Sequence, residues 1–288
     1  MTKPYNTKEL QFVLDYWTDK RKAKAEPVLP PKISYEKVNN LTNKNDYMII
    51  PQSNSDNSSS IISEPYEVDV NERPYFCGGN FFFTIGEGDD AQDKFGSAQF
   101  VGHSQVLLTA AHCVRDNVTG DYYKNFLFSR GYKETNGETE GQDFAIERVL
   151  TPDEWVSDPI NIAFDYAFCW TTTPYSDWMG MQIGIPQTEI HAIGYPGNYI
   201  DGKIMYGVDG TKGEMINNIV RMKGNPMRHG NSGGAWIGNL SNERRWDTNL
   251  AIGLNSSTPS DNEKNQLSPL FNQDTIDLFN TIINGDEL

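Results

Sequence analysis

The sequence is poor in basic residues and has no long apolar run. Its 288 residues carry 24 Lys and Arg against 39 Asp and Glu, a formal net charge of −15. Because phosphate groups are bound by clustered Lys and Arg, this balance disfavours nucleic acid and anionic membrane surfaces as partners. No stretch approaches the ~20 apolar residues that cross a bilayer. We therefore expect a monomer whose partner is a protein or peptide, without nucleic acid and without a membrane span.

Cysteine and a secretory leader are also lacking. Cys77, Cys113 and Cys169 form no even framework for disulfides, and buried thiols are expected, which weakly favours a reducing compartment. The opening residues, MTKPYNTKEL, contain no apolar leader core. We expect a cytoplasmic protein or one exported by a leaderless route, with secretion after leader removal as the alternative.

Histidine is scarce, and its positions restrict the chemistry of one serine. Ser232 lies between glycines in GNSGG (230–234), and no histidine follows it. Gly-x-Ser-x-Gly is found in ordinary turns and in two hydrolase designs. The strand-to-helix elbow of α/β-hydrolases is excluded, because its histidine follows the serine along the chain. The second design has the order His, Asp, Ser. The four histidines are His103, His112, His191 and His229.

Two upstream residues fit that order. His112 ends an apolar run of strand type, VLLTAAHCV, where a strand can present an imidazole at the end of a barrel. Asp165 lies between apolar and aromatic residues in IAFDYAFCW. An isolated buried carboxylate costs several kcal/mol, so Asp165 requires a hydrogen-bonded partner such as an imidazole N–H.

These motifs together resemble a known family. TAAHC (109–113), DYA (165–167) and GNSGG (230–234), in this order and at these separations, are similar to the chymotrypsin-like serine peptidases. GYPG (194–197) and Asn231 resemble the bacterial glutamyl endopeptidase branch. The likeness covers about residues 74 to 284. Taken singly, each motif is more often a turn or a structural residue; jointly they favour catalysis. A catalytically silent peptide-binding module on the same fold is the alternative.

The resemblance implies an all-β fold of two antiparallel six-stranded barrels with a C-terminal helix. Short apolar runs separated by turn residues agree with it. We expect an N-terminal extension over 1–70, a first barrel with His112 and Asp165 over 71–175, and a second barrel with Ser232 and the helix over 176–288. The active site would then lie in the cleft between the barrels.

The N-terminal extension is expected to contain one helix and a linker. Residues 7–25 place Leu10, Val13, Leu14 and Trp17 on one helical face, and residues 39–63 are rich in Asn and Ser. The helix either packs on the protein body or serves as a pro-segment or partner-docking helix. The acidic stretch GEGDDAQDK (86–94) lacks the spacing of a calcium loop and is expected to be a solvated hairpin, so no metal site is expected.

By resemblance, His112, Asp165 and Ser232 form a catalytic triad that needs no cofactor. His112 takes the hydroxyl proton of Ser232, and Asp165 orients the imidazole. The backbone N–H groups of Gly230 and Ser232 bind the oxyanion. Activity should rise through roughly pH 6.5 to 7.5 as His112 loses its proton.

Position-by-position likeness also suggests a substrate pocket. Trypsin-like members carry an aspartate where this chain has Pro226, so specificity for Lys or Arg is not expected. Gly253 stands in the place of a histidine that binds glutamate in the glutamyl endopeptidases, which puts glutamate preference in doubt. Arg228 and His229 either attract an acidic side chain or are exposed rim charges. The candidate pocket residues are Pro226, Arg228, His229, Gly253, Asn255 and Ser256.

Two departures from the family concern activation and disulfides. Members activated by a newly cut N-terminus have an aspartate before the serine, whereas this chain has Asn231, which lacks the necessary charge. The extension should therefore not be needed to assemble the oxyanion hole. The cysteine after the catalytic histidine commonly pairs with one on the preceding strand, but KFGSAQFVG (94–102) contains none. A Cys77–Cys113 bridge is the alternative to buried thiols.

Overall fold

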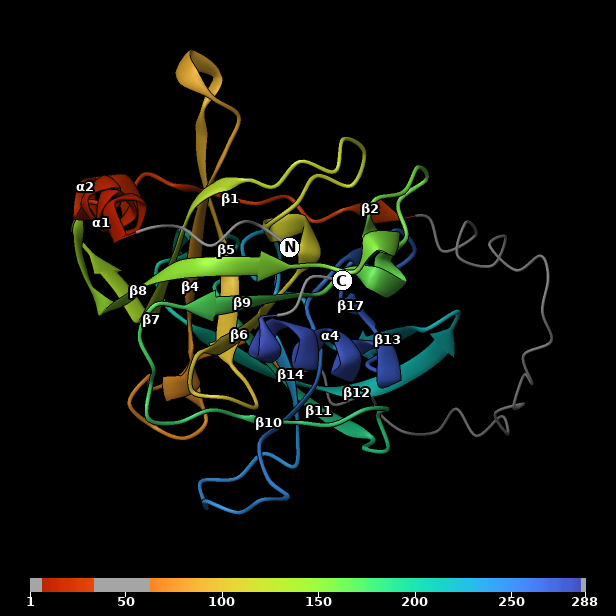
Figure 1. Ribbon diagram of the computed structural model, residues 1–288. Helices are drawn as coiled ribbons and strands as arrows, with labels where there is room; N and C mark the ends of the chain where they lie inside the picture. Colours follow the sequence, from red (N-terminus) through yellow and green to blue (C-terminus); the bar gives the residue numbers. More distant parts are fainter. Residues whose placement is uncertain (1–6, 34–62, 286–288) are drawn as a thin grey trace.

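The computed structural model describes residues 7–33 and 63–285. Two β-sheets lie next to each other, with the N-terminal helices on one side of the first sheet (Figure 1). The expected all-β fold with a C-terminal helix is confirmed. The first sheet is built mainly from residues 78–171 and the second from residues 180–269.

The first sheet is a closed barrel of six antiparallel strands. These are β4 (Gly78–Ile85), β5 (Gln92–Phe100), β6 (Val106–Thr109), β7 (Lys124–Thr135), β8 (Glu138–Leu150) and β9 (Ala167–Thr171). Their order is β5-β4-β7-β8-β9-β6, and pairing of Phe100 with Leu107 closes the barrel. Short β1 (Glu26–Pro27) adds to the outer edge of β5.

Strand β4 is buried on both faces, which explains its continuous apolar run. Side chains alternate along a strand, and Phe81 and Phe83 contact each other with ring centroids 6.1 Å apart. Phe82 contacts Trp17 of the N-terminal extension instead, at 5.2 Å. The N-terminal extension therefore covers one face of the first barrel.

The second sheet contains six antiparallel strands in the order β15-β14-β11-β12-β13-β17. They are β11 (Glu189–Gly194), β12 (Tyr206–Ile216), β13 (Ile219–Lys223), β14 (Ala235–Gly238), β15 (Leu250–Leu254) and β17 (Asn265–Pro269). Between its two end strands, an isolated bridge joins Ser257, which follows β15, to Leu267 of β17. Three short strands lie beside it: β3 (Tyr66–Glu67) on β12, β10 (Gly180–Met181) on β15, and β16 (Thr258–Pro259) paired with β2 (Lys32–Ile33).

The chain ends in helix α4 (Gln273–Asn284). Asn272 and Thr275 form a reciprocal capping box at its start, and Gly285 ends it with a φ of 72°, a left-handed conformation that glycine adopts without strain. Leu278 and Ile282 are buried, and the ring of Phe279 lies 5.5 Å from that of Phe168. The helix of the second half thus packs on the first barrel.

The described part of the N-terminal extension, residues 7–33 and 63–70, contains two helices where the sequence predicts one. Helix α1 (Thr7–Tyr16) ends early, and the side chain of Thr18 caps the short α2 (Asp19–Lys22). Val13 and Trp17 are buried as expected, but Leu14, which lies within α1, is 40% exposed. The helices pack on the first barrel, as expected. Most of the predicted linker, 39–63, lies outside the described residues.

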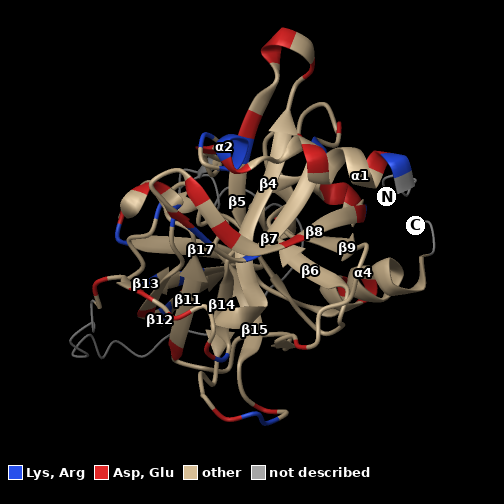
Figure 2. Ribbon diagram, turned by 90° about the vertical axis from the view of Figure 1, so that its left-hand side faces the viewer, with Lys and Arg blue, Asp and Glu red and all other residues tan. Residues whose placement is uncertain are grey.

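Charge is distributed in agreement with the acidic composition. Asp and Glu are scattered over the face seen in Figure 2, including the projecting β4–β5 hairpin. Within that hairpin, Asp93 accepts hydrogen bonds from Tyr16 (2.7 Å) and Arg21 (2.9 Å), so part of the acidic loop anchors the N-terminal helices. No helix in the described ranges is long and apolar enough to span a bilayer.

Trp17 should be a principal anchor of the extension. Its ring is 2% exposed, and its Nε1 donates to the carbonyl of Asn125 at 2.5 Å. Trp17→Ala should lower the free energy of unfolding by about 3–5 kcal/mol, because it leaves a cavity and an unpaired carbonyl. Denaturant unfolding measures this. Phe12→Ala is the matched control, since Phe12 is 57% exposed on α1, the helix that ends just before Trp17, and its effect should stay below about 0.5 kcal/mol. Equal losses would contradict the assignment.

Candidate active site

Asp165 is fully buried and is bound by three groups. It follows a short 3-10 turn (Ile162–Phe164) that precedes β9. Its Oδ1 accepts the backbone N–H of His112 at 2.9 Å, and its Oδ2 lies 2.8 Å from His112 Nδ1. Ser256 Oγ donates to the same Oδ2 at 2.5 Å. The imidazole partner that the sequence predicts for Asp165 is present, together with a hydroxyl that the sequence did not assign to it.

His112 lies at the end of a strand, as its sequence context indicates. It sits in the turn Ala111–Cys113 that follows β6, and it is 7% exposed. Burial alone would lower the pKa of His112, but the Asp165 carboxylate, with a contribution from Cys113, outweighs burial and raises this pKa to about 10. The expected rise in activity at roughly pH 6.5 to 7.5 is based on an ordinary imidazole, from which His112 departs in this way, and it stays a prediction.

Ser232 lies in a tight turn that requires its glycines. The N–H of Gly234 donates to the carbonyl of Asn231 at 3.0 Å. Gly233 has a φ of 87°, and a Cβ on it would lie 2.3 Å from the carbonyl oxygen of Ser97. A Cβ on Gly234 would lie 2.0 Å from the carbonyl oxygen of Ile193. Both positions exclude any larger residue, because the obstructing atoms belong to the backbone.

Buried polar residues of β5 hold this turn against the first barrel. Ser97 donates its N–H to the Ser232 carbonyl at 2.7 Å and its hydroxyl to the Gly230 carbonyl at 2.9 Å. Gln99 donates to the Gly233 carbonyl at 3.0 Å and accepts from the N–H of Ala235 at 2.8 Å. Sequence analysis missed both residues. Their signal is two polar residues with strand spacing in the otherwise apolar GSAQFVG.

The same turn is bound from the second sheet by Asn255. Its amide nitrogen donates to the carbonyls of Ile193 (2.9 Å) and Asn231 (3.3 Å), while Trp236 Nε1 donates to its Oδ1 at 2.9 Å. Since Asn255 precedes Ser256, which binds Asp165, one short segment links the serine turn to the buried carboxylate. Both residues were expected in the substrate pocket. In the structure, their polar atoms bind the protein framework.

The other pocket candidates divide into two groups. Gly253 lies within β15, packed against Trp236 and Ser268. Pro226 and Arg228 follow β13 and both bind Asn198, and an Arg228 guanidinium nitrogen donates to Thr258 Oγ1 at 3.2 Å. Partial burial lowers the pKa of Arg228. Arg228 is therefore a half-buried cation next to β16 and not a free rim charge. His229, between Arg228 and Gly230, has a φ of 42°.

Two buried polar atoms at the centre of this arrangement remain without partners. Among the described residues, neither Ser232 Oγ nor His112 Nε2 makes a hydrogen bond. Buried polar atoms are nearly always paired in folded proteins, so such exceptions call for an explanation. In resting enzymes the bond between nucleophile and base is often long and shortens only when substrate binds.

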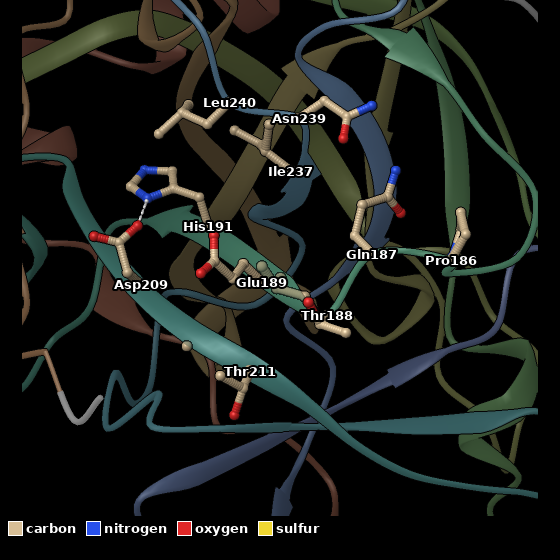
Figure 3. Close-up of a pocket in the computed structure, with 12 residues that line it drawn as sticks. Pro186, Gln187, Thr188, Glu189, His191, Asp209, Thr211, Ile237, Asn239 and Leu240 are labelled. Carbon is tan, nitrogen blue, oxygen red and sulfur yellow. Dashed lines mark hydrogen bonds and ion pairs between the residues drawn. The ribbon is translucent and has the colours of Figure 1, made fainter. Parts of the chain in front are cut away.

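A second histidine–aspartate pair lies at a separate cavity of about 690 Å³ beside β11 and β12 (Figure 3). His191 Nδ1 is 2.7 Å from Asp209 Oδ1, and this hydrogen bond lowers the pKa of Asp209. His191 Nε2 packs against Gly207, where an added Cβ would lie 2.9 Å away. The hydroxyl residues lining this cavity are Thr188 and Thr211, and Ser232 is not among the residues that line it. This pair joins two strands, and within the described ranges no hydroxyl or thiol is hydrogen-bonded to His191 Nε2.

All three cysteines are buried free thiols, as expected. The Cys77–Cys113 bridge is not formed. Cys113 faces Gly96 on β5, and a Cβ on Gly96 would lie 2.8 Å from Cys113 Sγ and 3.8 Å from its Cβ. The residue of β5 that faces Cys113 is therefore a glycine and not a cysteine.

Comparison with known proteins places the fold. No protein-family model and no curated protein sequence matches the chain. Among solved structures it is similar to the thermostable serine protease AL20 from an extremophilic microorganism, with a TM-score of 0.62 and 22% identity, covering 73% of this chain and 98% of that one. Protease Anisep from Arthrobacter nicotinovorans gives 0.62 and 22%, covering 76% and 98%. A Glu endopeptidase gives 0.61 and 16%, covering 76% and 95%. The chain has the chymotrypsin-like fold that these proteases share.

Gly96→Cys should create a disulfide with Cys113. The 3.8 Å between the two Cβ positions equals the usual separation in disulfides. Thiol counting in denaturant should fall from three to two reactive groups after oxidation of the variant, because one cysteine is added and two are consumed. Gly96→Ser is the matched control and should keep three thiols. Four reactive thiols in the oxidised cysteine variant would contradict this geometry.

His112 should titrate above the ordinary histidine pKa of about 6.5. Because the Asp165 carboxylate is the largest influence that raises it, Asp165→Asn should lower the pKa of His112. Imidazole chemical shifts followed by NMR measure both values. Equal midpoints for His112 in the two proteins would show that Asp165 does not set its charge.

Proposed function

We propose that this protein is a serine endopeptidase with His112, Asp165 and Ser232 as its catalytic triad. The observation that carries the proposal is the buried network in which Asp165 binds His112 and Ser256 while Asn255 binds the Ser232 turn. Burying a carboxylate and an imidazole together costs free energy unless hydrogen bonds replace the lost water. Such buried, charge-coupled pairs are therefore often found at functional sites. The fold supports the proposal, because it is shared with serine proteases.

The proposed reaction starts with proton transfer from Ser232 Oγ to His112 Nε2. Oγ attacks the peptide carbonyl carbon, and the carbonyl π electrons move to oxygen. His112 then donates the proton to the leaving amine as the C–N bond breaks, which leaves an acyl-serine. Water attacks the ester in the same way and returns the serine. Asp165 holds the imidazole with its Nδ1–H inward and stabilises the imidazolium.

The backbone N–H groups of Gly230 and Ser232 are the proposed oxyanion donors. Gly230 has a φ of 77°, a left-handed backbone conformation that glycine adopts without strain. One such donor contributes roughly 3–4 kcal/mol to the transition state in comparable sites. No step of this reaction requires a cofactor or a metal ion.

The proposed substrate is an extended peptide lying between the two barrels. We assign residues 71–175 to the unit that supplies His112 and Asp165, residues 176–288 to the unit that supplies Ser232, and residues 1–70 to an extension. Pro226, Arg228 and His229 border the proposed pocket. With Pro226 in place of an acidic residue, the pocket has no carboxylate there to bind Lys or Arg.

Serine-directed labelling tests the proposal. A fluorophosphonate should label the wild-type protein at Ser232, and Ser232→Ala should abolish both labelling and peptide hydrolysis. His112→Ala should lower turnover by a factor on the order of 10⁶, because the nucleophile loses its base. Cleavage of a peptide library gives the rates.

His191→Ala is the matched control, because it also removes a buried imidazole bound to an aspartate. It should keep labelling and turnover within a few-fold of wild type. Residual turnover above about one per cent in Ser232→Ala or His112→Ala would refute the triad. Absence of labelling in the folded wild type and in every folded variant would indicate a silent peptide-binding module.

A further inference from the structure

One segment of the N-terminal extension runs across the proposed active site and contacts it on two sides, which are β5 of the first barrel and β16 after Ser256. Residues 26–33, EPVLPPKI, run from α2 at one side of the molecule to β2 at the other (Figure 1). At its start, β1 pairs in parallel with β5 of the first barrel, with Pro27 beside Phe95. At its end, β2 pairs in parallel with β16, which follows Ser256. We call residues 26–33 the crossing segment.

Val28 is the residue of the crossing segment that meets the serine turn. Its N–H donates to the carbonyl of Phe95 at 2.9 Å, and its carbonyl accepts the N–H of Gly230 at 3.2 Å. Its side chain is 6% exposed. Gly230 is one of the two proposed oxyanion donors, so a carbonyl of the chain itself occupies the position that a substrate carbonyl would need.

Further contacts fix the crossing segment on either side of Val28. Glu26 pairs with Lys94 of β5 at 2.7 Å. Pro27 packs against Gly197, where an added Cβ would lie 3.1 Å from the proline ring. Beyond Val28, the carbonyl of Pro31 accepts the hydroxyl of Ser257 at 2.6 Å. These contacts add to the backbone pairing of β1 with β5 and of β2 with β16, which is how extended peptides add to sheet edges.

Two features lower the entropic cost of holding the segment in this place. Three of its eight residues are proline, which restricts the backbone before it binds. The helices upstream are anchored by Trp17 and by the ion pair of buried Lys22 with Asp143 at 2.5 Å. Because the segment is tethered next to the groove, its effective concentration there far exceeds that of a free peptide.

We propose that the crossing segment occupies the substrate groove and inhibits the enzyme until it is displaced. This inference rests on the proposed peptidase function. The Gly230 N–H cannot bind an oxyanion while it donates to Val28, and the pairing edges of β5 and β16 are not free for a second strand. Activity then requires release of the segment from the groove. It differs from activation by insertion of a new N-terminus, because the segment blocks a formed site.

The first test introduces a charge at a buried position of the crossing segment, so that the segment leaves the groove while the rest of the protein is unchanged. Val28→Asp places an unpaired carboxylate at a 6% exposed position, which strongly disfavours the bound state. It should raise the rate of fluorophosphonate labelling at Ser232 at least tenfold. Leu29→Asp is the matched control, because Leu29 is the next residue and is 69% exposed. Its labelling rate should stay within twofold of wild type.

A charge swap gives a second test that leaves the core unchanged. Glu26→Lys opposes Lys94 and should raise the labelling rate about two- to threefold, as expected for an exposed pair. Combining it with Lys94→Glu restores the pair with its signs exchanged and should return the rate toward wild type. Near-ultraviolet circular dichroism confirms that each variant remains folded.

Hydrogen exchange at the Gly230 amide distinguishes failure of this inference from failure of the proposed function. The amide should be protected in wild type and Leu29→Asp, and exchange faster in Val28→Asp.

Equal labelling of wild type, Val28→Asp and Glu26→Lys would overturn the inhibition. Self-cleavage after Val28, seen by intact mass, would also overturn it, because the segment would be a substrate. If the Gly230 amide exchanges faster in Val28→Asp but Ser232 is labelled in no variant, the peptidase function is refuted, and the inhibition with it. The position of the crossing segment on Gly230 would still be confirmed.

Discussion

The geometry of the candidate site depends on the buried carboxylate of Asp165. It is fully enclosed, and a charge in such a place is tolerated only where hydrogen bonds replace the lost water. The backbone and ring of His112 supply two of these bonds from the first barrel, and Ser256 supplies a third from the segment after β15. Satisfying one carboxylate therefore fixes the relative position of the two halves of the molecule.

The serine turn is placed by a second set of buried polar bonds, and this set follows from the same need. Ser97 and Gln99 project from β5 into the junction and bind carbonyls on either side of Ser232. Asn255 binds the turn from the opposite side. Because the glycines bring backbone atoms into direct contact, these carbonyls and amides have no room for water and must find protein partners. The tight turn and its polar supports require each other.

Sequence patterns predicted the parts of this structure that are set locally or by motif. The predicted parts include the alternating strands and the terminal helix. The motifs also predicted that Asp165 needs a hydrogen-bonded partner, and they proposed His112, Asp165 and Ser232 from their order along the chain. The supports were not predicted, because Ser97, Gln99 and Asn255 acquire their roles only when distant segments meet. The helix end at Tyr16 was missed because a cap at Thr18 competes with an apolar pattern that continues past it. Gly253 was assigned to the pocket by position, yet its strand turns it toward Trp236.

The two histidine–aspartate pairs show why geometry around a pair matters more than the pair itself. His191 and Asp209 are as close as His112 and Asp165, but Asp209 is about half exposed whereas Asp165 is enclosed. An exposed carboxylate is stabilised by water and needs no further donors, so it does not organise its surroundings. Asp165 recruits Ser256, and through Asn255 the serine turn, because it has no water to rely on. The Gly230 amide at the edge of that turn obeys the same rule, and in this structure the Val28 carbonyl satisfies it.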